Sequence, residues 1–228
     1  MVPGPTGIAT KMRDTKQFVR RLIRTAGKTY AEQSGIRLKD KPMPLFQLLV
    51  LAMLASKPIS ADVAATAARQ LFKAGMRTPR AVLTGDRQKV IAAFGRAGYA
   101  RYDESSATRL CDMARRVQDE YDGDLRNLGV RCGHDAGRAA DELVKFNGIG
   151  PTGADVFLRE VQVVWPWVRP HFDDKALAAA RELDLPTAPS DLAALAPRSN
   201  AQLAAALVRV SLDDELRDEV TRSSVSKR

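Results

Sequence analysis

The stretch that decides the fold is Leu143–Leu158, which reads LVKFNGIGPTGADVFL. An apolar helical run ends before Gly148–Gly150, and a second helical run starts at Pro151. Glycine permits a tight turn where a side chain would clash, and proline suits the first turn of a helix, where its missing N–H costs nothing. The pattern predicts a helical hairpin over about residues 138–160, with Ile149 packed between its two helices.

The same hairpin predicts a site for a phosphate group. The exposed backbone N–H groups of the turn lie at a helix N-terminus, which attracts anions. The candidate residues for such a site are Gly148, Ile149, Gly150, Thr152 and Gly153. Backbone donors of this kind hold a nucleic-acid strand without reading its sequence. An ordinary helix–turn–helix in a bundle would show the same glycines, so a second observation is needed.

The charge of the chain supplies that observation. The 228 residues carry a formal net charge of +9, and residues 1–41 hold ten Lys or Arg against three Asp or Glu. A basic chain favours a polyanionic partner, nucleic acid first and an anionic membrane surface second. A solvated helix face is the alternative explanation for the basic segment. The length suits one large domain or two small ones.

Several classes of protein are disfavoured. No apolar run approaches the roughly 18 residues of a membrane span, and the N-terminus lacks the pattern of a secretory signal. The two cysteines, Cys111 and Cys132, are too few for a four-cysteine iron–sulfur cluster or zinc ribbon. The histidines His134 and His171 stand alone. We therefore expect no metal, no cofactor, no membrane partner and a cytoplasmic, nucleoid-associated location.

Nearly every periodic segment predicts a helix, and none shows the alternation of a strand. We expect an all-α chain of about ten helices, with a loose tail at 1–15, a stiff linker at 165–170 and a polar C-terminal end. The predicted helices span residues 16–31, 45–55, 60–73, 78–85, 86–95, 103–121, 134–146, 151–163 and 173–183, with two more within 187–210.

Four segments together resemble the helix-hairpin-helix DNA glycosylases, the family that includes endonuclease III and the mismatch-repair adenine glycosylase. They follow the family's order over about residues 45–185: the apolar helix at 45–56, the loop FGRAGYARY at 94–102, the hairpin followed by ADVFL, and FDDK at 172–175 before a helix. The resemblance implies a two-lobed helical fold. Residues 16–44 and 165–228 would form one lobe, and residues 45–164 a six-helix lobe with the helix-hairpin-helix motif.

The resemblance also implies an activity. Such enzymes flip a damaged or mispaired base out of duplex DNA and hydrolyse its N-glycosidic bond. Asp173 matches the family's catalytic aspartate, with Asp174 as the second choice, and a carboxylate there would stabilise positive charge at C1′. Capping of the following helix is another role for either residue. Lys57, Tyr99 and Arg101 match positions that press into DNA beside the flipped base; ordinary surface roles are the alternative.

Two departures from the family narrow the activity. Its bifunctional members carry a lysine where this chain has Thr152, and a hydroxyl cannot form the imine that β-elimination requires. The family's cysteine cluster is also missing, since residues 186–228 contain no cysteine. The resemblance thus implies a monofunctional, monomeric glycosylase of double-stranded DNA without an iron–sulfur cluster. Lyase activity is not expected unless Lys145 or Lys175 supplies the amine.

Two other functions stay open at the level of sequence. A catalytically inactive helix-hairpin-helix protein that binds distorted or damaged DNA would explain the missing lysine and cluster, whereas Asp173 argues against it. A basic all-helical transcription or chromatin factor would explain the charge, but no convincing recognition helix is present. The identity of the excised base does not follow from the sequence, because pocket residues would be scattered over several helices.

Overall fold

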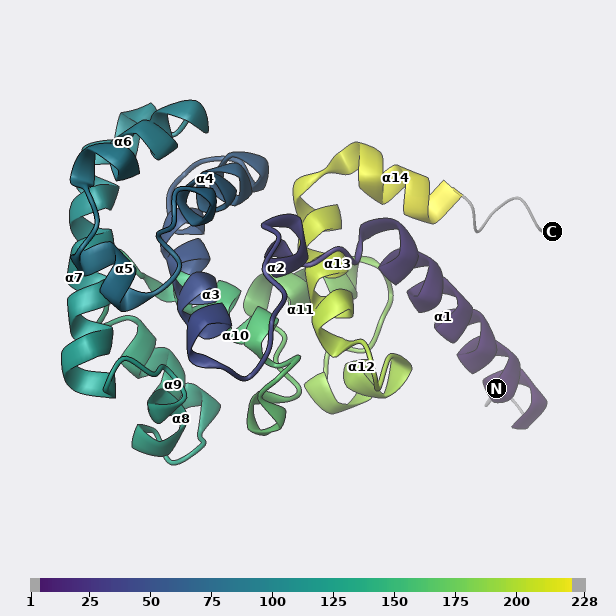
Figure 1. The fold of residues 1–228 in the computed structure, drawn as a ribbon. Helices are drawn as coiled ribbons and strands as arrows, with labels where there is room; N and C mark the ends of the chain where they lie inside the picture. Colours follow the sequence, from purple (N-terminus) through teal and green to yellow (C-terminus); the bar gives the residue numbers. More distant parts are fainter. Residues whose placement is uncertain (1–4, 223–228) are drawn as a thin grey trace. The chain divides into compact units, whose positions relative to one another are not determined.

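The computed structural model describes the backbone of residues 5–222 and the side chains of residues 13–222, and this part of the chain is built from helices without a strand (Figure 1). The predicted all-α class is confirmed. None of the described helices is both long and apolar enough to cross a membrane. The predicted loose tail at 1–15 is wrong from Pro5 onward, because helix α1 (Pro5–Ala26) starts there; residues 1–4 lie outside the described range.

The chain divides into two compact units. The larger unit is Tyr30–Val168, and the smaller unit combines Met1–Thr29 with Arg169–Arg228. Residues 30–44 and 165–168, which the sequence analysis placed in the lobe of 16–44 and 165–228, belong to the larger unit.

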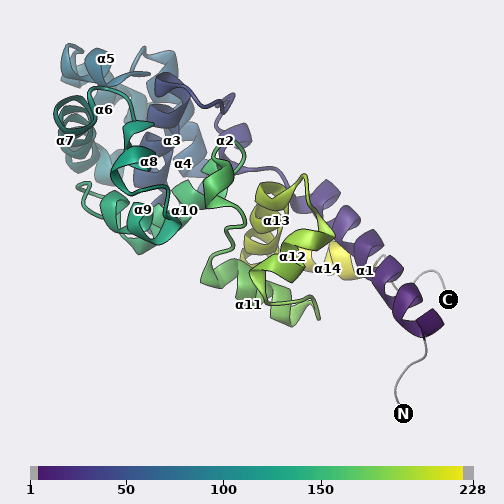
Figure 2. The same ribbon diagram turned by 90° about the horizontal axis from the view of Figure 1, so that it is seen from below.

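Helix α3 (Pro42–Ala55) forms the centre of the larger unit. Its residues from Pro44 to Leu54 are all buried, as expected for a helix that is apolar on every side. It packs against α2 (Tyr30–Gln33), α4 (Ala61–Lys73) and α10 (Pro151–Val161) (Figures 1 and 2). Two prolines in the first turn of α3 sacrifice no intrahelical hydrogen bond.

The other elements of the larger unit surround this centre, and four helices of this unit begin at capping side chains. Ser60, Thr78, Asp86 and Asp135 each accept a hydrogen bond from a backbone N–H two or three residues ahead. The elements are α5 (Pro79–Leu83), α6 (Arg87–Arg96), the 3-10 helix η1 (Ala100–Tyr102), α7 (Asp103–Tyr121), α8 (Asn127–Arg131), α9 (Ala136–Leu143) and the 3-10 helix η2 (Pro166–Val168).

Helix α13 (Asn200–Leu212) forms the centre of the smaller unit, where it packs against α1, α11 (Asp174–Glu182) and α14 (Asp214–Arg222). The remaining helix there is α12 (Pro189–Leu195). Helix α14 was expected to be part of a polar tail. It forms because one face carries Val220, which is 1% exposed in the core of this unit.

Candidate nucleic-acid interface

The turn between α9 and α10 has the geometry that its glycines predict. Gly148 has φ +93°, in the left-handed region that favours glycine. Ile149 is 4% exposed, and its N–H donates to the Phe146 carbonyl at 2.9 Å. Gly150 is the extended residue before α10, and Pro151 is the first residue of that helix. The side chain of Ile149 is therefore packed inside the hairpin, as expected.

The three glycines of this segment serve different purposes. At Gly153 a Cβ atom would clash with Ser56 Oγ and would lie 3.2 Å from the Ala52 carbonyl oxygen. Gly153 is buried and lets α10 approach α3 closely, so the place of its missing side chain is filled by protein atoms and is closed to an external group. A Cβ atom at Gly150 would meet no heavy atom within 4 Å. Gly150 is thus the position where the turn is open to an external group.

The start of α10 offers donors to an anion. No side chain caps this helix, and Pro151 has no N–H. The N–H groups of Thr152 and Gly153 lie in the first turn, where an α-helix provides no carbonyl partner. The side chain of Thr152 is exposed. Uncapped N–H groups and the positive end of the helix dipole together suit a phosphate oxygen.

Arg109 of α7 runs beside this turn. Its Cδ atom lies so close to Gly148 that a Cβ atom there would approach it to 2.7 Å. Its Nη1 atom is buried and has no hydrogen-bond partner among the described residues. Buried donors are usually satisfied, because an unpaired one costs free energy. A cationic donor without a partner beside the hairpin turn favours an anionic ligand at this place.

Helix α7 also holds the turn from the side. The Arg116 guanidinium donates to the Lys145 carbonyl and lies 5.0 Å from the centroid of the Phe146 ring. The Asn147 side-chain amide donates to Asp112 at 3.0 Å. These contacts fix the backbone just before the glycines, which keeps the turn preorganised for a ligand.

The carboxylate of Glu142, near the end of α9, forms polar contacts with three neighbouring side chains. Lys145 Nζ donates to it at 2.7 Å, the Tyr121 hydroxyl donates at 3.3 Å, and Arg131 lies 3.7 Å away. The hydrogen bond from Lys145 is the main cause that holds the pKa of Glu142 below its usual value. Burial is the main cause that raises the pKa of Tyr121 to about 12, with the charge of Glu142 adding to it.

We expect Glu142→Gln to lower the stability at pH 7 by about 1 kcal/mol or less, because its partners are partly exposed. A folded pKa below the unfolded one means that Glu142 stabilises the fold above an unfolded pKa of about 4.3 and loses this effect as the pH falls through the folded pKa. Urea unfolding should therefore show a difference between variant and parent at about pH 7 that shrinks at about pH 3.5. Asp141→Asn, at an exposed neighbour, should show no such change. A difference that grows in acid would contradict the assignment.

Tyr99 is not placed as a DNA wedge, and this expectation is corrected. Its side chain is 1% exposed, and its ring lies 5.1 Å from that of Phe94. Its hydroxyl donates to the Leu54 carbonyl and accepts from Ser106, both at 3.4 Å. Burial raises its pKa. A ring held inside the core cannot enter a base stack.

Tyr102, three residues further on, takes the surface position instead. The Lys57 ammonium lies 5.8 Å from the centroid of its ring, and the Arg101 guanidinium lies 5.5 Å from it. The structure thus brings Lys57 and Arg101 together on one partly buried aromatic ring. The sequence reasoning missed Tyr102, although its position just before a long helix was a usable signal.

Asp173 caps α11 in the smaller unit. Its Oδ1 atom accepts a hydrogen bond from the Ala176 N–H at 2.9 Å, and the residue is 6% exposed. The capping role predicted for it is confirmed. Asp174 is the first residue of the helix and is exposed. The catalytic role of either residue stays a prediction.

The described residues contain no cluster of three or more His, Cys, Asp or Glu side chains that suits a metal ion. Protein-family models, curated proteins and solved structures give no match to the chain. A function therefore has to rest on the hairpin with Arg109, the cationic group on Tyr102, and the capping aspartate.

Proposed function

We propose that the protein is a monofunctional DNA glycosylase of base excision repair. It flips a damaged or mispaired base out of duplex DNA and hydrolyses the N-glycosidic bond. The observation that carries this proposal is the hairpin turn, where an uncapped helix start lies beside Arg109, whose buried Nη1 atom has no hydrogen-bond partner among the described residues. Two compact helical units agree with the two-lobed glycosylase fold that we propose for the chain. The protein acts as a monomer on DNA of the nucleoid.

The parts have separate roles in this proposal. The N–H groups at the start of α10 bind a phosphate without reading sequence. Lys57 and Arg101 contact the phosphate backbone of the DNA. Tyr102, whose ring both cations face, offers a surface on which an unpaired base can stack. The wedge role first assigned to Tyr99 passes to Tyr102.

Asp173 supplies the chemistry. As the bond between C1′ and the base nitrogen breaks, positive charge develops at C1′, and a carboxylate stabilises that charge. Water then forms the new C–O bond at C1′; its proton passes through the carboxylate, and the departing base leaves protonated. Thr152 cannot form an imine, so the product is an abasic site in an intact strand.

The test is an excision assay on duplexes that each carry one damaged or mispaired base. Strand cleavage that requires hot alkali would support a monofunctional glycosylase. Strand cleavage without alkali would show lyase activity. Loss of that cleavage in Lys145→Ala or in Lys175→Ala would then identify the lysine that supplies the amine.

A second function is favoured by one observation. Asp173 is 6% exposed and its Oδ1 atom is engaged in capping α11, so the carboxylate is partly committed to the fold. An inactive helix-hairpin-helix protein that binds distorted or damaged DNA would have this arrangement. Tight binding to such duplexes, with no base excised from any of them, would establish this alternative.

Gly150→Ala should weaken duplex DNA binding by about tenfold, because a methyl group there blocks a hydrogen bond to a charged phosphate. Stability should stay unchanged, since the added Cβ meets no atom within 4 Å. Gly148→Ala is the comparison: φ of +93° and contact with Arg109 should make it mainly a stability defect. Anisotropy titration measures the DNA affinity of the two variants, and urea unfolding measures their stability. Parental affinity in Gly150→Ala would show that the turn does not hold DNA.

A further inference from the structure

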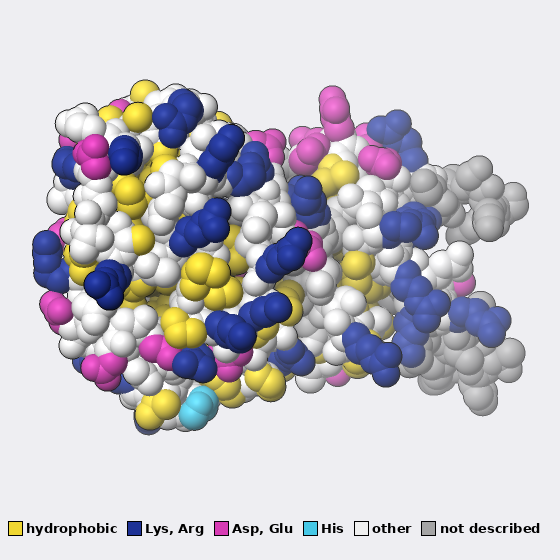
Figure 3. Space-filling view, in the orientation of Figure 1, with side chains coloured by type: hydrophobic (Ala, Val, Ile, Leu, Met, Phe, Trp, Pro, Cys, Tyr) yellow, Lys and Arg dark blue, Asp and Glu magenta, His cyan; other side chains and the backbone are white. Residues whose placement is uncertain are grey.

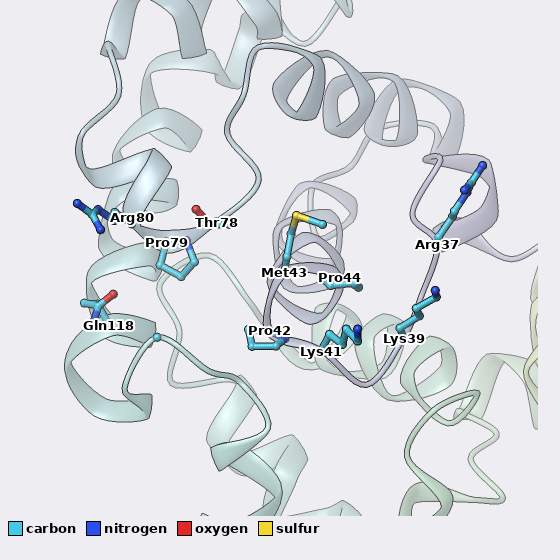
Figure 4. A pocket seen from close by; sticks show the side chains of 11 residues that line it. Arg37, Lys39, Lys41, Pro42, Met43, Pro44, Thr78, Pro79, Arg80 and Gln118 are labelled. Atoms are coloured by element: carbon cyan, nitrogen blue, oxygen red, sulfur yellow. The ribbon is translucent and has the colours of Figure 1, made fainter.

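A second basic site lies in the larger unit, at the N-terminal end of α3. A cavity of about 610 Å³ opens there, with Met43 and Pro79 on its surface and four cationic side chains around it: Arg37, Lys39, Lys41 and Arg80 (Figure 4). The hairpin glycines pack against Ala52 and Met53 at the other end of the same helix. At 1.5 Å per residue, Met43 and Met53 are roughly 15 Å apart along α3.

The cationic side chains of this cavity are not paired with an acidic side chain in the described part of the chain. No carboxylate is among its lining residues, and none of its four cationic side chains forms a salt bridge with a described residue. Asp40, the nearest acid along the chain, accepts a hydrogen bond from Trp165 Nε1 at 3.0 Å. On this face of the larger unit, Lys and Arg side chains surround a hydrophobic group (Figure 3). Uncompensated cations around a hollow attract a polyanion.

The arrangement of these cations favours a linear polyanion over a compact one. Residues 36–39 are neither helix nor turn. The chain then bends at residues 40 and 41, where the Lys41 N–H donates to the Lys39 carbonyl at 2.8 Å. Figure 4 shows Arg37, Lys39 and Lys41 in succession along one rim, with Arg80 on the opposite rim. Arg37 and Lys39 are separated by two residues of extended chain, about 6–7 Å, which is close to the spacing of phosphates along an extended nucleic-acid strand. A compact polyphosphate would instead require cations that converge on one point.

We propose that this cavity binds an extended single strand of nucleic acid. Its phosphates follow Arg37, Lys39 and Lys41, a base lies against the exposed side chain of Met43, and Arg80 closes the far side. No aromatic residue lines the cavity, so binding has little base preference. The proposal extends the proposed DNA binding to a second surface, and it holds whether or not a base is excised.

The test is fluorescence anisotropy with a labelled oligothymidylate of about twelve nucleotides. The row variant, Arg37→Gln/Lys39→Gln/Lys41→Gln, removes the three cations that follow one another along one rim. The control variant, Lys73→Gln/Lys89→Gln/Arg138→Gln, removes three exposed positive charges elsewhere in the larger unit. The row variant should bind about tenfold more weakly or worse, and its log–log salt slope should fall by about 2. The control should change affinity less than about twofold. Thermal unfolding of both variants checks that they fold.

Each other outcome overturns the proposal. Equal weakening by both variants would mean that only net charge matters. No binding of the oligonucleotide by the parent protein, or a loss confined to duplex DNA, would exclude a single-strand site. Inorganic triphosphate that binds through the row while the oligonucleotide does not would assign a compact ligand. Gly150→Ala in duplex binding and Asp173→Asn in base excision report on the proposed function, whereas the comparison of the row variant with its control reports on this site, so the two failures are separable.

Discussion

Asp173→Asn should lower the rate of base excision by about a hundredfold or more and leave the affinity for duplex DNA near that of the parent. A carboxylate beside a phosphate backbone is unfavourable in the ground state and becomes favourable when C1′ turns cationic, so its removal affects the transition state selectively. The amide oxygen of Asn can still accept the hydrogen bond that the Ala176 N–H donates to residue 173, so capping of α11 should survive. Single-turnover excision and anisotropy titration measure the two effects.

Two matched variants separate catalysis from capping. Asp173→Ser also keeps a capping oxygen without the negative charge, so it should be as inactive as Asp173→Asn and nearly as stable as the parent. Asp174→Asn changes the exposed neighbour and should stay active. A loss of activity that only follows a loss of thermal stability would assign Asp173 to capping alone. Loss in Asp174→Asn with an active Asp173→Asn would move the catalytic role by one residue.

Glu160→Ala should destabilise the larger unit by about 3 kcal/mol or more. Glu160 lies in α10, the second helix of the hairpin, and is 1% exposed. Its two carboxylate oxygens accept hydrogen bonds from the backbone N–H groups of Tyr30 at 3.0 Å and Ala31 at 2.9 Å, at the start of α2. Removal of the carboxylate leaves both donors without this acceptor and opens a cavity.

Urea unfolding of the parent, Glu160→Ala and Glu160→Gln checks this prediction. Glu160→Gln should be intermediate, because an amide offers one oxygen where the carboxylate offers two. An unfolding free energy of Glu160→Ala within about 0.5 kcal/mol of the parent would show that α2 does not depend on this carboxylate. Asp119→Asn, an exposed acid of α7, serves as the surface control.

Features with a local cause could be predicted from the sequence. The helices predicted from residues 60, 78, 86 and 173 each begin one residue later, and Ser60, Thr78, Asp86 and Asp173 cap them through hydrogen bonds that reach only two or three residues ahead. Helix α7 has the predicted bounds, 103–121. The hairpin formed for the same reason, since glycine and proline restrict the backbone wherever they stand.

Features that depend on distant contacts could not be predicted. Tyr99 follows Gly98 in a short loop, which suggests exposure, yet it is buried because its hydroxyl reaches the Leu54 carbonyl of α3. The role of Gly153 depends on Ser56, at the end of α3. Glu160 accepts hydrogen bonds from Tyr30 and Ala31, which lie about 130 positions earlier in the chain.

The sequence by itself therefore determined the helical class, the capped helix starts and the hairpin, because their causes lie within a few neighbouring residues. Only the tertiary structure decided which side of each helix faces protein and which stays open to a ligand, because burial depends on packing between segments far apart in the chain. The hairpin is an example of each kind of feature. Its glycines predict the turn from the sequence, but only the packing shows that Gly153 is closed against α3 and that Gly150 is open.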